Sequence, residues 1–310
     1  MKPRYIHIGS WNIEHFGRAD DTPSNQFAIA EHIEMSGVNV LALQEMYVTD
    51  VSGTRLLNSF LDKAFQLIED HTGHKWEYEI FPNRDPGDRS QLCGIAWDTT
   101  RVTKEHETLR IAVSHSVTEQ HELASEELKL NLWDRAPHAI KFVAKPGTDD
   151  GVRLTDFVIV PMHMKSNVGQ RHVVMRTRFH EAVELIKQLP TIRQHFDEEH
   201  IILLGDTNCK QRSEDAIQAF INAGLEDLNE DDIPTYAIGN DAPFDRIFIP
   251  RRRRDNDFRF SRQYILRSAS PLAHDKYLSD HYMVKTSILV RKDQEPEPVA
   301  PQGAAVAGAQ

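Results

Sequence analysis

The tetrapeptide Gly205-Asp206-Thr207-Asn208 places a carboxylate and a carboxamide two residues apart, directly after the apolar run 201–204. A buried strand that ends in this way could hold a water molecule beside a phosphate. Asp206 could accept a proton from that water, and Asn208 could donate a hydrogen bond to a phosphoryl oxygen or to the water. Gly-Asp-x-Asn is also a favourable tight turn, because Asp and Asn side chains bond their own backbone. The tetrapeptide alone therefore leaves both interpretations open.

Further polar clusters accompany other strand-like apolar runs along the chain. They are Trp11-Asn12 after 5–10, Gln44-Glu45 after 38–43, His163-Met164-Lys165-Ser166-Asn167 after 157–162, Phe244-Asp245-Arg246 inside a strand 244–249, and Ser279-Asp280-His281 before 282–284. Together with the tetrapeptide, their order (WN, QE, HxKS, GDxN, FDR, SDH) resembles the endonuclease/exonuclease/phosphatase superfamily. This is the fold of pancreatic deoxyribonuclease and of abasic-site endonucleases. The resemblance covers about residues 5 to 290, and six motifs in family order are a strong signal.

The resemblance implies a metal site around Glu45, whose family equivalent is the main metal ligand, with Asn12 beside it. Mg²⁺ prefers few protein oxygens and several waters, so one carboxylate with help from Asn12 and Asp280 suffices. The alternative is that Glu45 only caps a strand at the surface. The apolar run before it favours a position at a sheet edge that faces a cleft.

An acid/base pair of His281 and Asp245 is also implied. A carboxylate bonded to one imidazole nitrogen fixes the tautomer and favours the protonated form, which leaves the other nitrogen to face a phosphate. His163 matches the second histidine of the deoxyribonuclease-like branch. Abasic-site endonucleases carry different residues in this region, so His163 argues against close membership of that branch.

Three residues are candidates for phosphate contacts. Lys165 and Asn167 follow His163 directly, and Arg135 in Asp134-Arg135-Ala136-Pro137 resembles an Arg-x-Pro strand start that reaches the phosphate in many members of the superfamily. Without the resemblance, Arg135 would be interpreted as part of an ordinary surface ion pair.

Hydrophobic periodicity predicts helices at 169–189, stopped by Pro190, at a segment after Pro23-Ser24, at 54–70 before Gly73, and at 213–223 before Gly224. Strands are expected at 76–81, 92–97, 139–143 and 152–160, the last two forming a hairpin around 146–151. Helices mixed with hairpins indicate an α/β fold: a four-layer sandwich of two packed mixed β-sheets flanked by helices. We expect one catalytic domain over 1–292 and a disordered tail over 293–310, where Glu-Pro alternation gives way to Ala, Gly and Gln.

The composition is typical of a globular enzyme, and it argues against a membrane-spanning protein and against a disulfide-stabilised secreted protein. It has 310 residues, a net charge of −11 and only two cysteines, Cys93 and Cys209, which we interpret as buried bystanders. No apolar run approaches a membrane span and no signal peptide is evident, so we expect a cytoplasmic, reduced protein. Gly-x-Ser-x-Gly and P-loop patterns are absent from the sequence. The basic run Arg251–Arg254 is either a contact to a phosphate backbone or a solvated loop.

These observations predict a Mg²⁺- or Mn²⁺-dependent phosphodiesterase, first of all a nuclease that hydrolyses DNA by in-line attack of water on phosphorus. One alternative is a phosphatase or phosphodiesterase acting on a lipid or small-molecule phosphate, which the acidic net charge fits better. Another is a catalytically inactive binding module of the same fold. We disfavour the inactive module because it would be expected to lack a motif residue, and all of them are present: Glu45, Asp206, Asn208, Asp245 and His281.

Overall fold

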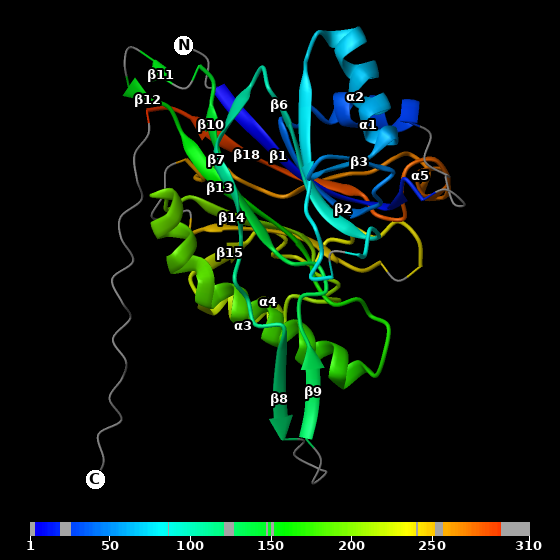
Figure 1. The fold of residues 1–310 in the computed structure, drawn as a ribbon, viewed down its shortest axis with the longest axis vertical. Helices are drawn as coiled ribbons and strands as arrows, with labels where there is room; N and C mark the ends of the chain where they lie inside the picture. The colour runs from blue at the N-terminus through cyan, green and yellow to red at the C-terminus, as the bar shows by residue number, and fades with distance from the viewer. Residues whose placement is uncertain are drawn as a thin grey trace.

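Two six-stranded β-sheets pack face to face and are covered on their outer faces by helices (Figure 1). The structure is a computed structural model. It describes residues 4–18, 26–85, 87–120, 127–146, 148–149, 152–239, 241–251 and 257–292.

The first sheet has the strand order β17-β18-β1-β2-β6-β5. Its strands are β17 (Tyr264–Leu266), β18 (Met283–Val290), β1 (Arg4–Phe16), β2 (Val40–Met46), β6 (Leu92–Asp98) and β5 (Trp76–Ile80). β1 and β2 are parallel, whereas the other neighbours are antiparallel. The sheet is therefore mixed.

The second sheet has the order β15-β16-β14-β13-β10-β7. Its strands are β15 (Leu225–Asp227), β16 (Asp245–Pro250), β14 (Ile201–Asp206), β13 (Asp156–His163), β10 (His138–Ala144) and β7 (Val102–Arg110). Here β13 and β14 form the parallel pair. The central strands β10, β13 and β14 are buried along their whole length. This explains why they read as continuous apolar runs rather than alternating ones.

Helices close both outer faces. α1 (Gln26–Ser36) and α2 (Ser59–Thr72) pack their apolar residues on the first sheet, and α3 (Arg171–Phe196) and α4 (Asp215–Asn222) pack theirs on the second. A third cluster of apolar side chains fills the space between the sheets. The four-layer α/β sandwich expected from the sequence is confirmed.

One short helix and three hairpins lie outside the two sheets. The short helix α5 (Pro271–Tyr277) lies beside α1. The ring centroids of His32 on α1 and His274 on α5 are 5.5 Å apart. Three hairpins are formed by β3 (Asp50–Ser52) with β4 (Arg55–Leu57), β8 (Ser116–Gln120) with β9 (Glu127–Asn131), and β11 (Thr148–Asp149) with β12 (Val152–Arg153). The β8–β9 hairpin projects beyond α3, away from the sandwich (Figure 1).

The prediction that Pro190 stops a helix is wrong, because α3 continues to Phe196. Proline inside a helix costs about 3 kcal/mol, since it lacks an N–H and crowds the preceding turn. Ile192 and Phe196 extend the buried stripe beyond it and are almost fully buried. Each such side chain contributes about 1.5–3 kcal/mol, which offsets the cost of the proline. The helix ends instead at Asp197, which is left-handed with a φ of 47°.

The predicted helix 54–70 begins too early. Leu56 and Leu57 belong to β4, and the turn of that hairpin uses Gly53 with a φ of 61°. The Asn58 side chain then accepts hydrogen bonds from the N–H groups of Phe60 (3.1 Å) and Leu61 (2.9 Å). This N-cap fixes the start of α2 at Ser59.

Other local predictions are confirmed. α2 ends at the left-handed Gly73, α4 ends before Gly224, and β10 pairs with β13 in antiparallel register. Both cysteines are buried and free. Strand β7, the β8–β9 hairpin and α5 were not predicted. The proposed tail 293–310 and residues 252–254 of the arginine run lie outside the described residues.

None of the helices in the described part of the chain is both long enough and apolar enough to span a membrane.

Candidate active site

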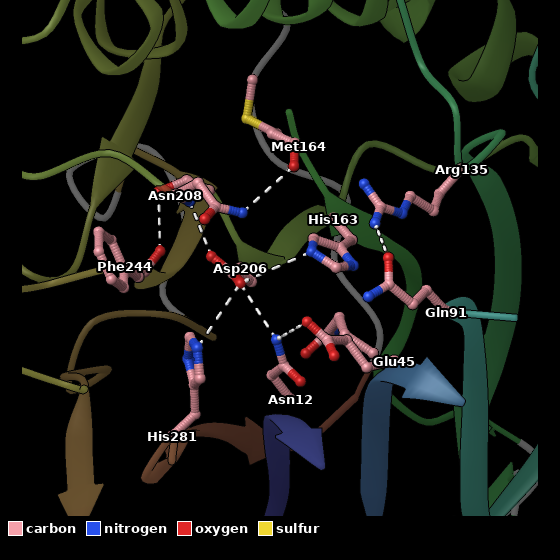
Figure 2. Close-up of polar contacts among 12 residues, drawn as sticks. Asn12, Glu45, Gln91, Arg135, His163, Met164, Asp206, Asn208, Phe244 and His281 are labelled. Atoms are coloured by element: carbon pink, nitrogen blue, oxygen red, sulfur yellow. Dashed lines mark hydrogen bonds and ion pairs between the residues drawn. The ribbon is translucent and has the colours of Figure 1, made fainter. Parts of the chain in front are cut away.

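Strand ends from both sheets meet at one end of the sandwich and surround a cleft of about 690 Å³ (Figure 2). Most of the residues singled out from the sequence line it: Glu45, Arg135, His163, Lys165, Asn167, Asp206, Asn208, Asp280 and His281. Asn12 and Asp245 lie behind this lining and contact residues within it. The structure thus brings the whole predicted set together.

The base of the cleft is formed where β13 and β14 run side by side in parallel. His163 is paired with Asp206 in the register, and Met162 with Gly205. A Cβ atom on Gly205 would lie 1.9 Å from the carbonyl oxygen of Met162, so no other residue fits without moving a strand. The glycine of the Gly-Asp-x-Asn motif therefore sets the close spacing of the two catalytic candidates.

Asp206 is the centre of the polar network. Its Oδ1 accepts a hydrogen bond from the backbone N–H of Asn208 (2.7 Å), and its Oδ2 accepts one from Asn12 Nδ2 (3.1 Å). The Asn12 bond joins the two sheets. Burial raises the pKa of Asp206 to about 6, with the nearby charges of Asp245 and Glu45 acting in the same direction. A carboxylate with a pKa near neutrality is suited to accept a proton.

Two histidines flank Asp206 at similar distances, with Nε2 of His163 at 3.7 Å and Nε2 of His281 at 3.8 Å from its Oδ2. Burial acts to lower the pKa of both rings, but the charges around them differ. Around His163, the charges of Arg135 and His281 act in the same direction, so its pKa lies well below the usual value. Around His281, the carboxylates of Asp245 and Asp206 outweigh burial and hold its pKa well above the usual value. One ring is neutral and the other is an imidazolium.

The predicted pairing of His281 with Asp245 is present, since His281 Nδ1 lies 2.8 Å from Asp245 Oδ2. Thr235 Oγ1 donates to the same oxygen (2.7 Å). Nδ1–H therefore donates to the Asp245 carboxylate, and because the ring is in its imidazolium form, Nε2 carries a second proton that faces Asp206 and the cleft.

Asn208 has a left-handed backbone with a φ of 54°. Its Nδ2 donates to the Met164 carbonyl (3.2 Å), which ties the Gly-Asp-x-Asn turn to the end of β13. An amide nitrogen carries two N–H bonds, so the second can serve a ligand in the cleft.

The proposed metal site is rich in carboxylate oxygen. Burial, followed by the charges of Asp280, Asp275 and Glu45, raises the pKa of Glu14 to about 7. Burial also raises the pKa of Asp280, with Glu45 adding to the effect. This crowding of negative charge would be relieved by a divalent cation, and oxygen donors suit Mg²⁺ or Mn²⁺.

Within the described ranges, no group of three or more His, Cys, Asp or Glu side chains is placed so that it could hold a metal ion. Mg²⁺ usually keeps several waters and one or two carboxylates, so an open site at Glu45 fits this ion. Asn12 Nδ2 donates to Glu45 Oε1 (3.2 Å), while Asn12 Oδ1 accepts from the N–H of Glu14 (3.2 Å). Asn12 thus orients Glu45, and its role as a ligand stays a prediction.

The predicted phosphate contacts occupy the other side of the cleft. Arg135 Nη2 donates to Gln91 Oε1 (2.5 Å), and Lys165 Nζ lies 3.8 Å from Asp134. Asn167 donates its amide to the Asn208 carbonyl (3.0 Å) and accepts from Arg178 (3.2 Å). Asn167 is therefore held by protein partners, and its contact to a phosphate stays a prediction, as do those of Arg135 and Lys165.

Several residues of the site were not identified from the sequence. Gln91 directly precedes the apolar run of β6, a position like that of the predicted strand-end groups, and it could have been found on that basis. Tyr236, whose ring meets that of His281 edge-on at 5.1 Å, lies in an irregular loop and gave no signal. Glu14 and the buried Glu181 on α3 were also missed.

The sequence matches no protein-family model and no curated protein. Its fold is similar to several solved structures. An endonuclease/exonuclease/phosphatase from Bacteroides vulgatus aligns with a TM-score of 0.59 and 13% identity, over 94% of this chain and 100% of that one. The mannosyl-6-phosphatase Bt3783 of Bacteroides thetaiotaomicron gives 0.53 and 14%, over 91% and 99%. Truncated Caenorhabditis elegans TDP2 gives 0.51 and 13%, over 92% and 97%.

Proposed function

We propose that this chain, which has the fold of the endonuclease/exonuclease/phosphatase superfamily, is a divalent-metal-dependent hydrolase of phosphoesters. One observation carries the proposal. Asp206, with a pKa of about 6, lies between a neutral and a charged histidine at the base of a cleft, opposite a group of carboxylates. This arrangement combines a base, a cationic donor and an oxygen-rich cation site within one hydrogen-bonded network.

In the proposed reaction, the Asp206 carboxylate accepts a proton from the attacking water, and Asn208 orients that water or a phosphoryl oxygen. The imidazolium of His281 and the guanidinium of Arg135 stabilise the negative charge that develops on the phosphoryl oxygens. Asp245 holds the His281 ring in the required tautomer. Glu45 would hold Mg²⁺ or Mn²⁺, which supplies further charge neutralisation when bound. The bond from phosphorus to the leaving oxygen breaks as the bond to the water oxygen forms, and Asp280 either helps to hold the ion or assists departure of the leaving alkoxide.

DNA is the first substrate to test, because His163 matches the second histidine of the deoxyribonuclease-like branch of the superfamily. On that substrate the resemblance predicts a 5′-phosphate and a 3′-hydroxyl product. The basic residues Arg135 and Lys165 at the cleft would contact the phosphates on the scissile side.

A small phosphate ester is the second candidate, and one feature favours it. Beyond Arg135 the cleft adjoins a pocket of about 230 Å³ lined by Asp85, Asp88 and Asp134 together with Arg84. These carboxylates oppose the passage of a polyanionic strand on that side, but they could bind the hydroxyl groups of a neutral moiety. The similarity in fold to a mannosyl-6-phosphatase is in keeping with this candidate.

The deciding experiment incubates purified protein with supercoiled plasmid, single-stranded DNA, RNA, a sugar phosphate and a generic phosphodiester. Each is tested with Mg²⁺, Mn²⁺ or EDTA. We expect hydrolysis with either metal and its loss in EDTA, because the donor set is oxygen-based. Full activity in EDTA would remove the metal from the proposal, and no hydrolysis of any substrate would overturn the function itself.

A further inference from the structure

Glu181 lies behind the cleft on α3, with only 2% of its surface exposed. Its Oε1 accepts a hydrogen bond from the backbone N–H of Trp133 (2.9 Å), and its Oε2 accepts one from the backbone N–H of Lys165 (2.8 Å). Trp133 and Lys165 belong to different loops, one entering β10 and the other leaving β13. A single carboxylate therefore ties two loops to one helix.

Each of these loops carries a side chain that lines the cleft. Arg135 follows Trp133 by two residues, and Lys165 follows His163 by two residues. The separation of the two loops determines how far Arg135 lies from His163 across the phosphate-binding side. Glu181 is thus placed to set the width of the cleft at this point without touching a substrate.

The backbone at Trp133 shows that this loop is held under constraint. Trp133 is left-handed, with a φ of 51°, and is completely buried. Its indole Nε1 donates to the main-chain carbonyl of Glu181 (3.1 Å). A bulky residue keeps this rare conformation only where its surroundings determine it, and such residues cluster at functional sites. Glu181 supplies two of the contacts that do so.

The presence of an ionisable carboxyl group at the buried position of Glu181 also requires an explanation. Burial, with Asp134 adding to it, raises the pKa of Glu181 to about 7, although the two N–H donors and Arg135 oppose the shift. Burial therefore makes ionisation of Glu181 costly, and the two N–H donors explain why the site nevertheless holds a carboxyl group. An amide offers one acceptor oxygen, whereas two N–H donors face this side chain, so only a carboxyl group satisfies both.

We infer that Glu181 is a positioning residue, whose carboxylate holds the Arg135 loop and the His163–Lys165 loop at the separation that phosphate binding requires. This inference rests on the proposed phosphoester hydrolysis. Arg178, one turn earlier on α3, supports the second loop by donating to the Lys165 carbonyl (3.3 Å) and to Asn167 Oδ1 (3.2 Å).

The test compares Glu181→Gln with a matched control, Glu184→Gln. Glu184 lies on the same helix and also accepts a backbone N–H, from Ser114 (3.3 Å), which belongs to a segment outside the cleft lining. We expect Glu181→Gln to lower kcat/KM by about 10- to 100-fold, since a displacement of about 1 Å costs that much, with kcat affected more than KM. The control should stay within about twofold of wild type.

Three further measurements separate positioning from general destabilisation. Amide exchange at Trp133 or Lys165 should rise in Glu181→Gln, because one N–H loses its acceptor, and the inhibition constant of inorganic phosphate should rise with it. In an Arg135→Ala background the Glu181→Gln change should cost much less, because its effect acts partly through Arg135. Should Glu181→Gln fail to fold, Glu181→Asp keeps two acceptors on a shorter stem and should show the same kcat loss.

Wild-type-like kcat/KM in the folded Glu181 variant, or losses that multiply with those of Arg135→Ala, would overturn the inference while leaving the proposed function intact. A wild-type protein that hydrolyses none of the substrates would instead overturn the proposed function, and the inference with it.

Discussion

Two buried polar clusters lie at opposite ends of strand β13. At its start, Lys141 Nζ contacts Asp156 (2.9 Å), Glu198 (3.4 Å) and the carbonyl of Phe196 (2.9 Å). At its end, His163 lies beside Asp206 at the base of the cleft. Both clusters are composed of ionisable groups with very little exposed surface. They differ in how their surroundings shift the protonation equilibria.

At the start of β13, Lys141 and Asp156 are held in their charged forms. Burial opposes the charge on Lys141, but Asp156 and Glu198 outweigh it and raise its pKa. Burial likewise opposes the charge on Asp156, but Lys141 and Arg153 lower its pKa. At the cleft, the pKa of Asp206 is moved toward neutrality and His163 is held neutral. A balanced buried pair is costly to break by removing one partner, whereas groups that can exchange protons near pH 7 are suited to catalysis.

The largest expected effect on activity comes from replacing Asp206, the carboxylate at the cleft that can exchange a proton near pH 7. Asp206→Asn keeps the shape but replaces one of the two acceptor oxygens with an amide N–H, and it cannot accept a proton, so kcat should fall by about 10²–10⁴-fold. The thermal unfolding midpoint should change little by comparison. Steady-state kinetics and circular dichroism measure the two quantities. Turnover within a few-fold of wild type would mean that the catalytic carboxylate has been misidentified.

A smaller effect is expected from pH. Asp206 must be deprotonated to act as a base, so kcat/KM should fall as the pH drops through about 6, by about tenfold per pH unit below that limb. A bound cation near Glu45 favours the carboxylate and moves the limb below 6. Activity should also fall at high pH, where His281 loses its proton, above its usual range. A kcat/KM that shows no fall on the acid side, at any pH at which the protein stays folded, would contradict the assignment of Asp206 as the base.

The smallest effect on activity is expected at the other end of β13. Lys141→Met leaves Asp156 and Glu198 buried without this partner, which should destabilise the protein by roughly 3–5 kcal/mol. Below the melting transition, kcat should remain within about twofold of wild type, because the cluster lies at the far end of the strand. Denaturant unfolding and kinetics on the same preparation test this. A large loss of kcat in folded protein would show that the two clusters are coupled.

The sequence predicted the fold and the composition of the cleft because those depend on strand ends. Apolar runs identify buried strands, and polar residues that end them, such as Asp206 and Glu45, must converge where neighbouring strands end. The resemblance added their roles. The predicted groups all lie at or beside one cleft.

What could not be predicted depends on tertiary contacts. Pro190 carries the same local signal whether or not Ile192 and Phe196 are buried beyond it. The carboxylate of Glu181 serves loops about 50 and 16 residues away, and no local pattern encodes such partners. The protonated form of His281 beside Asp245 was predicted, whereas the lowered pKa of His163 follows from its burial and from Arg135 and His281, which are remote in sequence.

Glu45 occupies a left-handed backbone conformation, with a φ of 59°, at the end of β2. Such a conformation costs about 1–3 kcal/mol in a residue other than glycine, and this cost is met when the chain folds. Because the folded chain already holds the Glu45 carboxylate in position, a cation that binds at the proposed site would lose little affinity to the cost of ordering this side chain. Metal affinity and folding stability are then linked. A substitution that allows residue 45 to leave the left-handed conformation would stabilise the protein without metal and lower its affinity for the ion.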